Sequence, residues 1–429
     1  MTSFPEPILP PEVIDLIIDD LHDHPLTLRA CSLVSRNWLA TSRHHLFDEL
    51  YLTRGKLYTF RDLLTSPRNT VSSRLRSLHA TGLQYDEFKR LWPLLPAFPH
   101  LRSLHLHGNP LRFEDETLEP QSLPNITLLS LSHTHFASYR GLKQLFLRFP
   151  SLKILKLGRT SCDTLHGESR DIHPTRVDLD SLHITLTADM LGWLKWTGFS
   201  LRADCVEMEL ESMGMVLSEY LEALGSHLKF LTLKFETTGR LAIFSEQPRL
   251  RYNTALRSLK LTHAFWMIGD NEVRVAPALP RLLQQLESSR LEELVFNVLL
   301  GQSGTQYSLP QAATVQILDG AGFMGLRRVE FHGAWDRADD ILRKQFESTI
   351  STLLPTQYAR GIVHSLTMAQ PETDISAYGA DWKAPGFNGN VEEDAHLWII
   401  RYGLQQGRIP RKYWVSVAFD GRRARGTYR

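Results

Sequence analysis

The feature that most limits how this chain can fold is an apolar pattern, Leu-x-x-Leu-x-Leu, that returns about every 26 residues over most of its length. The pattern starts at Phe47 and ends, weakly, at Met368. Its last two apolar positions enclose one polar residue, which is typical of a strand with one buried face. We therefore predict an α/β solenoid, in which each repeat adds one strand and one helix and stacks on its neighbours.

The repeats are numerous and in phase. The triplets that fit are Phe47/Leu50/Leu52, Leu75/Leu78/Ala80, Leu101/Leu104/Leu106, Ile126/Leu129/Leu131, Leu152/Leu155/Leu157, Leu179/Leu182/Ile184, Cys205/Met208/Leu210, Leu228/Leu231/Leu233, Leu256/Leu259/Leu261, Leu291/Leu294/Phe296, Leu326/Val329/Phe331 and Val363/Leu366/Met368. Apolar residues at helical spacing predict helices over residues 88–92, 142–149, 188–196, 216–224, 279–286 and 339–353. The last three repeats are longer, as repeats with insertions or as a change toward a capping structure.

This pattern resembles the leucine-rich repeat family, which implies a horseshoe with a C-terminal cap. That family usually has Asn three residues after the third apolar position, where its amide satisfies backbone groups of the turn. Only Asn109 fits, whereas Thr134, Thr160 and Thr187 occupy this place in other repeats. Because a hydroxyl can make fewer hydrogen bonds than an amide, we expect a less regular horseshoe.

The first fifty residues predict a separate unit of three short helices. Pro11 and Pro25 suit first helical positions, where a missing N–H costs nothing, and Ser35 is a candidate cap for the third helix. Apolar residues cover well over half of the first helix, at Val13, Ile14, Leu16, Ile17, Ile18 and Leu21. About 40 residues are too few for a self-sufficient core, so this surplus apolar surface needs a partner.

These residues resemble an F-box, most closely that of F-box proteins found in fungi. The matching positions are Leu9, Pro10, Glu12, Val13, Ile14, Ile17, Leu21, Val34 and Trp38. The resemblance implies an F-box at residues 5–50 and a leucine-rich-repeat solenoid at 51–370. Residues 371–429 differ in composition, and we expect a C-terminal cap or tail with a basic end there. It also implies binding to a Skp-type adaptor, and through it to a cullin, by Leu9, Pro10, Ile14, Ile17, Val34 and Trp38. No catalytic residue is implied, because other subunits of such ligases transfer the ubiquitin.

Strand alternation predicts which side chains of the solenoid point outward. The outward residues that we expect to bind a target protein are His105, His107, Lys156, His183, Glu209, Glu211, Lys234 and Lys260. The same alternation exposes Ser103, Ser181, Thr185, Glu207, Thr232, Ser258, Thr262, Glu293, Asn297, Glu330 and His332. An acidic group at 207–211 thus lies one repeat before the basic residues Lys234 and Lys260.

Composition and motifs exclude several classes of function. The formal net charge is +1, so no global field draws the chain to nucleic acid or membrane. Three cysteines give no disulfide framework, and no phosphate loop, nucleophile elbow or zinc-protease motif is present. His105, His107, His133 and His135 have metal-like spacing but lack a convincing further ligand, so we expect neither metal nor cofactor. No signal peptide or membrane span is expected, which leaves the cytoplasm or the nucleus.

Three functions remain open. The first is a substrate-recruiting subunit of an SCF-type ubiquitin ligase, which is not itself an enzyme. The second is a leucine-rich-repeat scaffold or sensor unrelated to ubiquitin, in which the helical unit is only a cap. The third, less favoured, is a nucleic-acid-associated protein acting through residues 408–429, where seven Lys or Arg accompany one acid.

Overall fold

The computed structural model describes residues 9–22, 24–66, 69, 71–108, 110–111, 122–136, 138–162, 175–187, 190, 199–211, 215–246, 250–268, 272–286, 288–301, 311–333 and 340–367. The predictions for Asn109, for most of the helix at 188–196 and for the tail at 371–429 lie outside these residues. The described chain forms two compact units. The first contains residues 9–79 and Ala97–Leu101, and the second contains Ala80–Pro96 and the described part of Arg102–Ala369.

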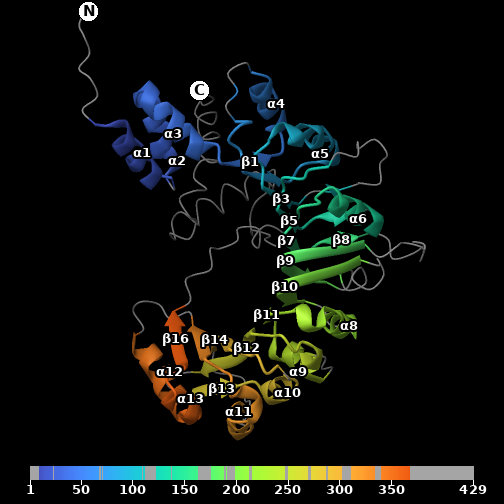
Figure 1. Cartoon of the computed structure of the whole chain (residues 1–429), viewed down its shortest axis with the longest axis vertical. Helices are drawn as coiled ribbons and strands as arrows, with labels where there is room; N and C mark the ends of the chain where they lie inside the picture. Colours follow the sequence, from blue (N-terminus) through green and yellow to red (C-terminus); the bar gives the residue numbers. More distant parts are fainter. Residues whose placement is uncertain are drawn as a thin grey trace, which may run out of the picture. The chain divides into compact units, whose positions relative to one another are not determined.

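The first unit begins with the three predicted helices, α1 (Pro11–Asp20), α2 (Pro25–Val34) and α3 (Arg36–Leu46) (Figure 1). Both prolines start their helices, and the Ser35 hydroxyl accepts a hydrogen bond from the Trp38 N–H at 3.3 Å. These three sequence predictions are confirmed.

A small apolar core holds the three helices together. Ile14, Ile18 and Leu28 are buried in it, and Leu21, Trp38 and Leu46 pack against them. Two polar contacts also tie α3 to α1: Thr41 Oγ1 donates to Asp15 Oδ1 at 2.6 Å, and His45 Nε2 lies 2.7 Å from Asp19 Oδ1. Few residues therefore fix the arrangement of these helices.

The rest of the first unit consists of β1 (Glu49–Thr53), α4 (Leu57–Thr65) and most of β2 (Ser77–Thr81). β1 and β2 are neighbours in one sheet. The boundary between the two units falls inside β2.

The second unit alternates strands and helices along the sequence (Figure 1). Its main-sheet strands are β3 (Ser103–His107), β5 (Leu128–Ser132), β7 (Ile154–Gly158), β9 (Thr175–Leu186), β10 (Phe199–Leu210), β11 (Phe230–Phe235), β12 (Ser258–Ile268), β14 (Glu293–Gly301), β15 (Arg328–Gly333) and β16 (Val363–Thr367), in that spatial order. All pairings between neighbours in this series are parallel. An α/β class with a parallel sheet is thus confirmed.

Helices follow most of these strands. They are α5 (Tyr85–Leu91), η1 (Trp92–Ala97), α6 (Tyr139–Leu147), α8 (Met215–Leu224), η2 (Gly225–His227), α9 (Thr238–Glu246), η3 (Leu250–Tyr252), α10 (Leu279–Gln284), α11 (Gln311–Leu318), η4 (Ala321–Phe323), α12 (Asp340–Leu353) and α13 (Pro355–Ala359). The sequence pattern did not predict α4 and α13, nor α9 and α11, whose apolar residues form no clear helical stripe. It also missed β13 (Glu272–Val275), which is antiparallel to β12, and a small sheet of β4 (Pro110–Leu111), β6 (His135–Phe136) and β8 (Ser161–Cys162).

Every predicted triplet has its second residue inside a strand. Leu104, Leu129, Leu155 and Leu182 align across β3, β5, β7 and β9, as the repeat requires. Two register predictions are wrong. On β16, Val363 aligns with Val329 and Leu366 aligns with His332, so the triplet Val363/Leu366/Met368 is out of register by three residues. On β10, Val206 aligns with both Leu182 and Leu231, so the triplet of this repeat is Ala203/Val206/Met208 and not Cys205/Met208/Leu210. Because the error is two residues, it leaves the predicted inward and outward faces of β10 unchanged.

A left-handed residue ends several strands at the same point of the repeat. Gly82, Gly108, His133 and Arg159 have φ between 46° and 63°. The N–H groups of the first three donate to carbonyls of the following strand at 2.8 Å. A non-glycine residue in this conformation costs about 1–2 kcal/mol, so the repeat imposes the turn on His133 and Arg159.

The core of the second unit changes character along the sequence. Leucines fill it from β3 to β9, with Phe88 and Trp92 packed together beneath them at a ring distance of 5.5 Å. From β12 onward, Phe265, Phe296 and Phe331 form a cluster with ring distances of 4.7, 5.0 and 5.5 Å. The larger side chains accompany the longer repeats at this end of the unit.

Candidate functional site

The three-helix unit carries apolar side chains that its own core does not cover. We call them the exposed apolar set: Leu9, Val13, Leu16, Ile17, Leu26, Leu33 and Val34. Leu33 is 87% exposed, Leu16 67% and Val34 64%. The set comes from α1, the residues before it, and α2. Large exposed aliphatic groups gathered on so small a unit indicate an interaction surface.

The residues expected to bind an adaptor divide into two groups. Leu9, Pro10, Ile17 and Val34 are exposed, so their side chains can contact another protein. Ile14 is only 4% exposed and Trp38 is half-buried, both in the core of the unit. Ile14 and Trp38 can therefore act only by supporting the exposed residues from behind.

The second unit has an outward face, made by the strand residues that alternate with the buried ones. Strand register arranges its side chains in rows. One row contains Ile154, Ser181, Cys205, Phe230, Ser258, Glu293 and Arg328. The next contains His105, Ser130, Lys156, His183, Glu207, Thr232 and Lys260. A third row starts at His107 on β3. Farther along the sheet, this row contains Glu209 on β10, which lies opposite Lys234 on β11.

All eight residues of the predicted target-binding face are at least partly exposed. Four other residues predicted to point to solvent are buried instead: Thr185, Thr262, Asn297 and Glu330. Thr262 on β12 bonds to the backbone of Phe235 on the preceding strand, β11, and Thr185 donates to Glu209 Oε2 at 3.1 Å. Longer neighbouring side chains and backbone contacts therefore cover residues that alternation alone would expose.

Glu207 is the centre of a charged cluster on the outward face. Its carboxylate lies 3.1 Å from His183 Nδ1 on β9 and 2.5 Å from Lys234 Nζ on β11. The hydrogen bond from His183, reinforced by Lys234, lowers the pKa of Glu207 from 4.5 to about 2, against the opposing effect of burial. Three neighbouring strands are thus joined by one fixed carboxylate.

The acidic group at 207–211 is engaged by other residues of the chain. Besides Glu207, Glu211 pairs with Arg159 at 2.7 Å and Glu209 accepts the bond from Thr185. Lys234 is already engaged by Glu207. Within the described residues, Lys156 and Lys260 have no ion pair, so among the predicted face residues these two lysines remain available to attract an acidic group.

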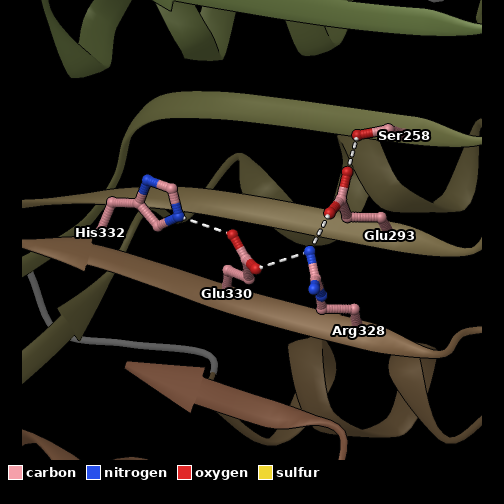
Figure 2. Close-up of polar contacts among 5 residues, drawn as sticks. All are labelled: Ser258, Glu293, Arg328, Glu330 and His332. Atoms are coloured by element: carbon pink, nitrogen blue, oxygen red, sulfur yellow. Dashed lines mark hydrogen bonds and ion pairs between the residues drawn. The ribbon is translucent and has the colours of Figure 1, made fainter. Parts of the chain in front are cut away.

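A second chain of polar contacts crosses β12, β14 and β15 (Figure 2). Ser258 Oγ donates to Glu293 Oε2 at 2.6 Å. The Arg328 guanidinium reaches both Glu293, at 3.3 Å, and Glu330, at 3.1 Å, while His332 Nε2 lies 2.7 Å from Glu330 Oε2. The contacts hold these side chains in one arrangement. Glu330 can be buried because its carboxylate keeps these partners.

The histidines whose spacing in the sequence resembles that of metal ligands do not form a metal site in the part of the chain that the structure describes. His107 and His133 contact edge to face at 5.2 Å, and His135 Nδ1 lies 2.9 Å from Ser161 Oγ. No group of three potential ligands occurs among the described residues.

Burial raises the pKa of the Cys205 thiol, which disfavours its thiolate.

Comparisons with known proteins add no family assignment. No family model matches the chain, and no curated protein matches its sequence. Within the described residues, no helix combines the length and apolar character needed to cross a lipid bilayer.

Some residues of the outward face were not predicted, among them Phe230, Arg328 and Arg159. Phe230 and Arg328 are the first residues of β11 and β15, two residues before the predicted outward residues Thr232 and Glu330, and Arg159 lies in a turn. Extending the strand alternation two residues toward the N-terminus would have identified Phe230 and Arg328. Nothing in the local sequence links Arg159 to Glu211, which is 52 residues away.

Proposed function

We propose that this protein is a substrate-recruiting subunit of an SCF-type ubiquitin ligase. In this proposal α1–α3 form an F-box that binds a Skp-type adaptor, and the strand–helix repeats form a leucine-rich-repeat solenoid that binds a target protein. The chain itself carries out no chemistry. It acts by proximity, because a bound target is held at a high effective concentration near the ubiquitin-transferring subunits.

The observation that carries the proposal is the exposed apolar set. Seven large aliphatic side chains remain uncovered on a unit whose own core contains only a few residues. A partner that covered Leu16, Leu33 and Val34 would gain on the order of 25 cal/mol for each Å² of apolar surface buried. The order of Leu9, Pro10, Glu12, Val34 and Trp38 along these helices supports an adaptor of the Skp type as that partner.

The outward face of the second unit supports the role assigned to the repeats. Its polar side chains are held by contacts between strands, at Glu207 and along the chain from Ser258 to His332. Side chains fixed before binding lose less conformational entropy when a target arrives. A rigid face with paired charges, and with two lysines that form no ion pair with any described residue, also favours partners with matching charge and rejects others.

Co-expression with a Skp-type adaptor tests the proposal. Wild-type protein should co-purify the adaptor. Leu33→Glu and Val34→Glu should abolish this, because each puts an unpaired charge into an apolar contact. Ile243→Glu is the matched control, since Ile243 is an exposed aliphatic residue on α9, and it should retain the adaptor.

Failure of the wild-type protein to retain any Skp-type adaptor contradicts the proposal and favours the scaffold or sensor. Retention by both α2 variants contradicts the assignment of the exposed apolar set as the binding surface. Circular dichroism of each variant keeps misfolding separate from loss of binding. The substitutions change side chains that are 87% and 64% exposed, so the helices should remain intact.

A further inference from the structure

Three side chains of the outward face form a continuous series from a serine to an imidazole to a carboxylate. Ser181 Oγ lies 3.0 Å from His183 Nε2, and His183 Nδ1 lies 3.1 Å from Glu207 Oε2. Both distances are in the hydrogen-bond range of about 2.6–3.2 Å that joins a nucleophile to its base and the base to the group that orients it. We call Ser181, His183 and Glu207 the serine triad.

Strand alternation and strand stacking together produce the serine triad. Ser181 and His183 are two residues apart on β9, so their side chains leave the same face of the sheet. Glu207 lies directly opposite His183 on β10, one repeat later in the chain. Its other oxygen, Oε1, pairs with Lys234 Nζ on β11 at 2.5 Å, so the carboxylate is held on both sides.

The proton positions that these contacts favour are those of an activated serine. The hydrogen bond from His183, reinforced by Lys234, lowers the pKa of Glu207 to about 2, so its carboxylate is charged and accepts from the Nδ1–H group of His183. In the neutral imidazole, Nε2 then carries the lone pair and accepts the hydroxyl proton of Ser181. His183 is therefore placed as a general base for Ser181, and Glu207 orients it.

A serine and a histidine two residues apart also meet on β2. Ser77 Oγ lies 3.1 Å from His79 Nε2, and Tyr51 stacks on this imidazole with ring centroids 4.3 Å apart. The contact between serine and imidazole is thus a recurring feature of these strands and does not by itself make a serine reactive. Reactivity at Ser181 depends on Glu207, which holds the second ring nitrogen of His183.

Ser181 is accessible and has apolar neighbours. Ser181 and His183 are both partly exposed. Strand register places Ile154 on one side of Ser181 and Cys205 on the other, with Phe230 beyond Cys205. The Phe230 side chain is 44% exposed, so an apolar group attached to a carbonyl at Ser181 can lie against it.

We propose that Ser181 is a nucleophile that takes the acyl group from small apolar carboxylic esters, with His183 as its general base. Ser181 and His183 are then the catalytic residues, and Glu207 is a positioning residue. The ligase function proposed above needs no chemistry from the chain, so this reaction is a separate activity of the outward face. It is also independent of adaptor binding, which we assign to α1 and α2.

The reaction has two stages. In the first, the hydroxyl proton of Ser181 moves to His183 Nε2 while Oγ bonds to the ester carbonyl carbon, whose oxygen becomes an oxyanion. The carbon–oxygen bond to the leaving alcohol then breaks, and His183 returns its proton to that alcohol. In the second stage water gives a proton to His183 and attacks the acylated Ser181. This releases the carboxylic acid and restores the serine.

The oxyanion has a weak stabiliser here, which limits the rate. The Ser181 N–H donates to Lys153 O at 3.1 Å and does not point to the reacting carbonyl. Lys156 lies opposite His183 on β7 and has no ion pair among the described residues, so we assign it to the oxyanion. A single flexible lysine gives less than fixed donors do. We therefore expect a slow reaction, accelerated chiefly by the base, by about 100- to 10,000-fold.

Reaction of the full-length chain with two kinds of probe tests the proposal. The p-nitrophenyl esters of butyrate and acetate report acyl transfer by releasing coloured p-nitrophenolate. An alkyl fluorophosphonate bonds to an activated serine with loss of fluoride, and peptide mass spectrometry then locates it. We expect release of p-nitrophenolate and a phosphonyl group on Ser181. Ser181→Ala should abolish both.

Further variants separate the roles of the three residues. His183→Ala should slow both reactions by about 100-fold or more, and added imidazole should restore part of the rate, which a merely structural role would not produce. Glu207→Gln should slow them by about tenfold or more, and Glu207→Asp should recover part of the loss because it keeps a carboxylate. Ser130→Ala is the matched control, since Ser130 is a partly exposed serine on the outward face of β5, and it should react like the wild type. The butyrate ester should have a lower KM than the acetate ester, and Phe230→Ser should remove this difference.

Several outcomes would overturn the proposal. They are a wild-type chain that does not react, a Ser181→Ala variant that reacts as fast as the wild type, and a label found on Cys205, a lysine or another serine. An unchanged rate in His183→Ala also overturns it, because Ser181 would then react without its base. Equal KM values for the two esters refute the preference for apolar acyl groups. The labelled residue is identified on the wild-type chain, so this part of the test does not depend on the folding of any variant.

Discussion

Two threonines at the same place of successive repeats have different environments. Thr134 and Thr160 each follow a left-handed residue and are fully buried. Thr134 Oγ1 donates to Ser132 O at 3.3 Å and to Leu106 O at 3.4 Å, whereas Thr160 Oγ1 has no partner among the residues that the structure describes. The hydroxyl of Thr134 therefore stabilises its turn, whereas burial of the Thr160 hydroxyl costs folding free energy.

We predict opposite effects of the same substitution at these two positions. Thr160→Val should leave stability unchanged or raise it by about 1 kcal/mol, because it removes an unsatisfied buried hydroxyl. Thr134→Val should lower stability by about 1 kcal/mol, because two carbonyls lose their donor. Urea denaturation of both variants measures the difference. Equal destabilisation would show that the hydroxyl of Thr160 has a partner.

Glu207 gives stability a dependence on pH. Its folded-state pKa of about 2 lies below the usual 4.5, so its pairs with His183 and Lys234 contribute fully above about pH 5. That contribution is lost as the pH falls from about 5 toward 2, and it amounts to about 1–2 kcal/mol after screening by solvent. Glu207→Gln should be less stable at pH 6 and should flatten the decline in acid. A decline in acid as steep as that of the wild type would contradict this assignment.

At the scale of elements, the helix caps and strand-end turns are local and separable. Ser35 is non-helical and accepts the Trp38 N–H, so it satisfies one of the free donors at the start of α3. Trp38 in turn packs on the core of the three-helix unit. The cap therefore positions one of the residues that support the exposed apolar set.

We predict that Ser35→Ala destabilises α3 by about 1 kcal/mol, whereas Ser35→Asp retains the cap. Amide hydrogen exchange resolved to peptides should show faster exchange in residues 36–46 for the alanine variant only. Exchange in β9 and β10 should not change, and serves as the internal reference. Unchanged exchange in α3 would mean that packing of Trp38, and not the cap, sets the start of this helix.

At the scale of the whole molecule, the second unit is a series in which each strand pairs with the next. Stability in such an array is approximately a sum of repeat and nearest-neighbour terms. Leu129 on β5 and Phe331 on β15 are both fully buried but are separated by many repeats. A substitution that destabilises one of these strands should therefore destabilise the adjacent strands before it affects the other.

We predict that Leu129→Ala, which should cost about 2–5 kcal/mol, speeds amide exchange in β3, β5 and β7 and leaves β14 and β15 unchanged. Phe331→Ala should do the reverse. Hydrogen exchange with mass spectrometry on both variants makes the comparison. A uniform increase throughout the second unit in either variant would instead show that it unfolds as a single cooperative block.

The sequence alone determined the positions of the repeat strands, the starts of α1–α3, the cap at Ser35 and most outward side chains. These features follow from short-range rules: a period of two along strands, a period of 3.6 along helices, and the chemistry of proline and serine at helix starts. Even the error at Cys205/Met208/Leu210 preserved the faces, because a shift by two residues keeps side chains on the same side.

Only the tertiary structure decided which side chains meet across repeats. Whether Glu207 is free or shared by His183 and Lys234 depends on strand register. A pocket lined by Arg257, Arg290 and Arg327 depends on stacking, because these residues come from repeats about 35 residues apart. The burial of Glu330 and Ile14 likewise depends on neighbours distant in sequence. Local patterns specify the direction of a side chain, whereas its surroundings are set by the packing of the chain.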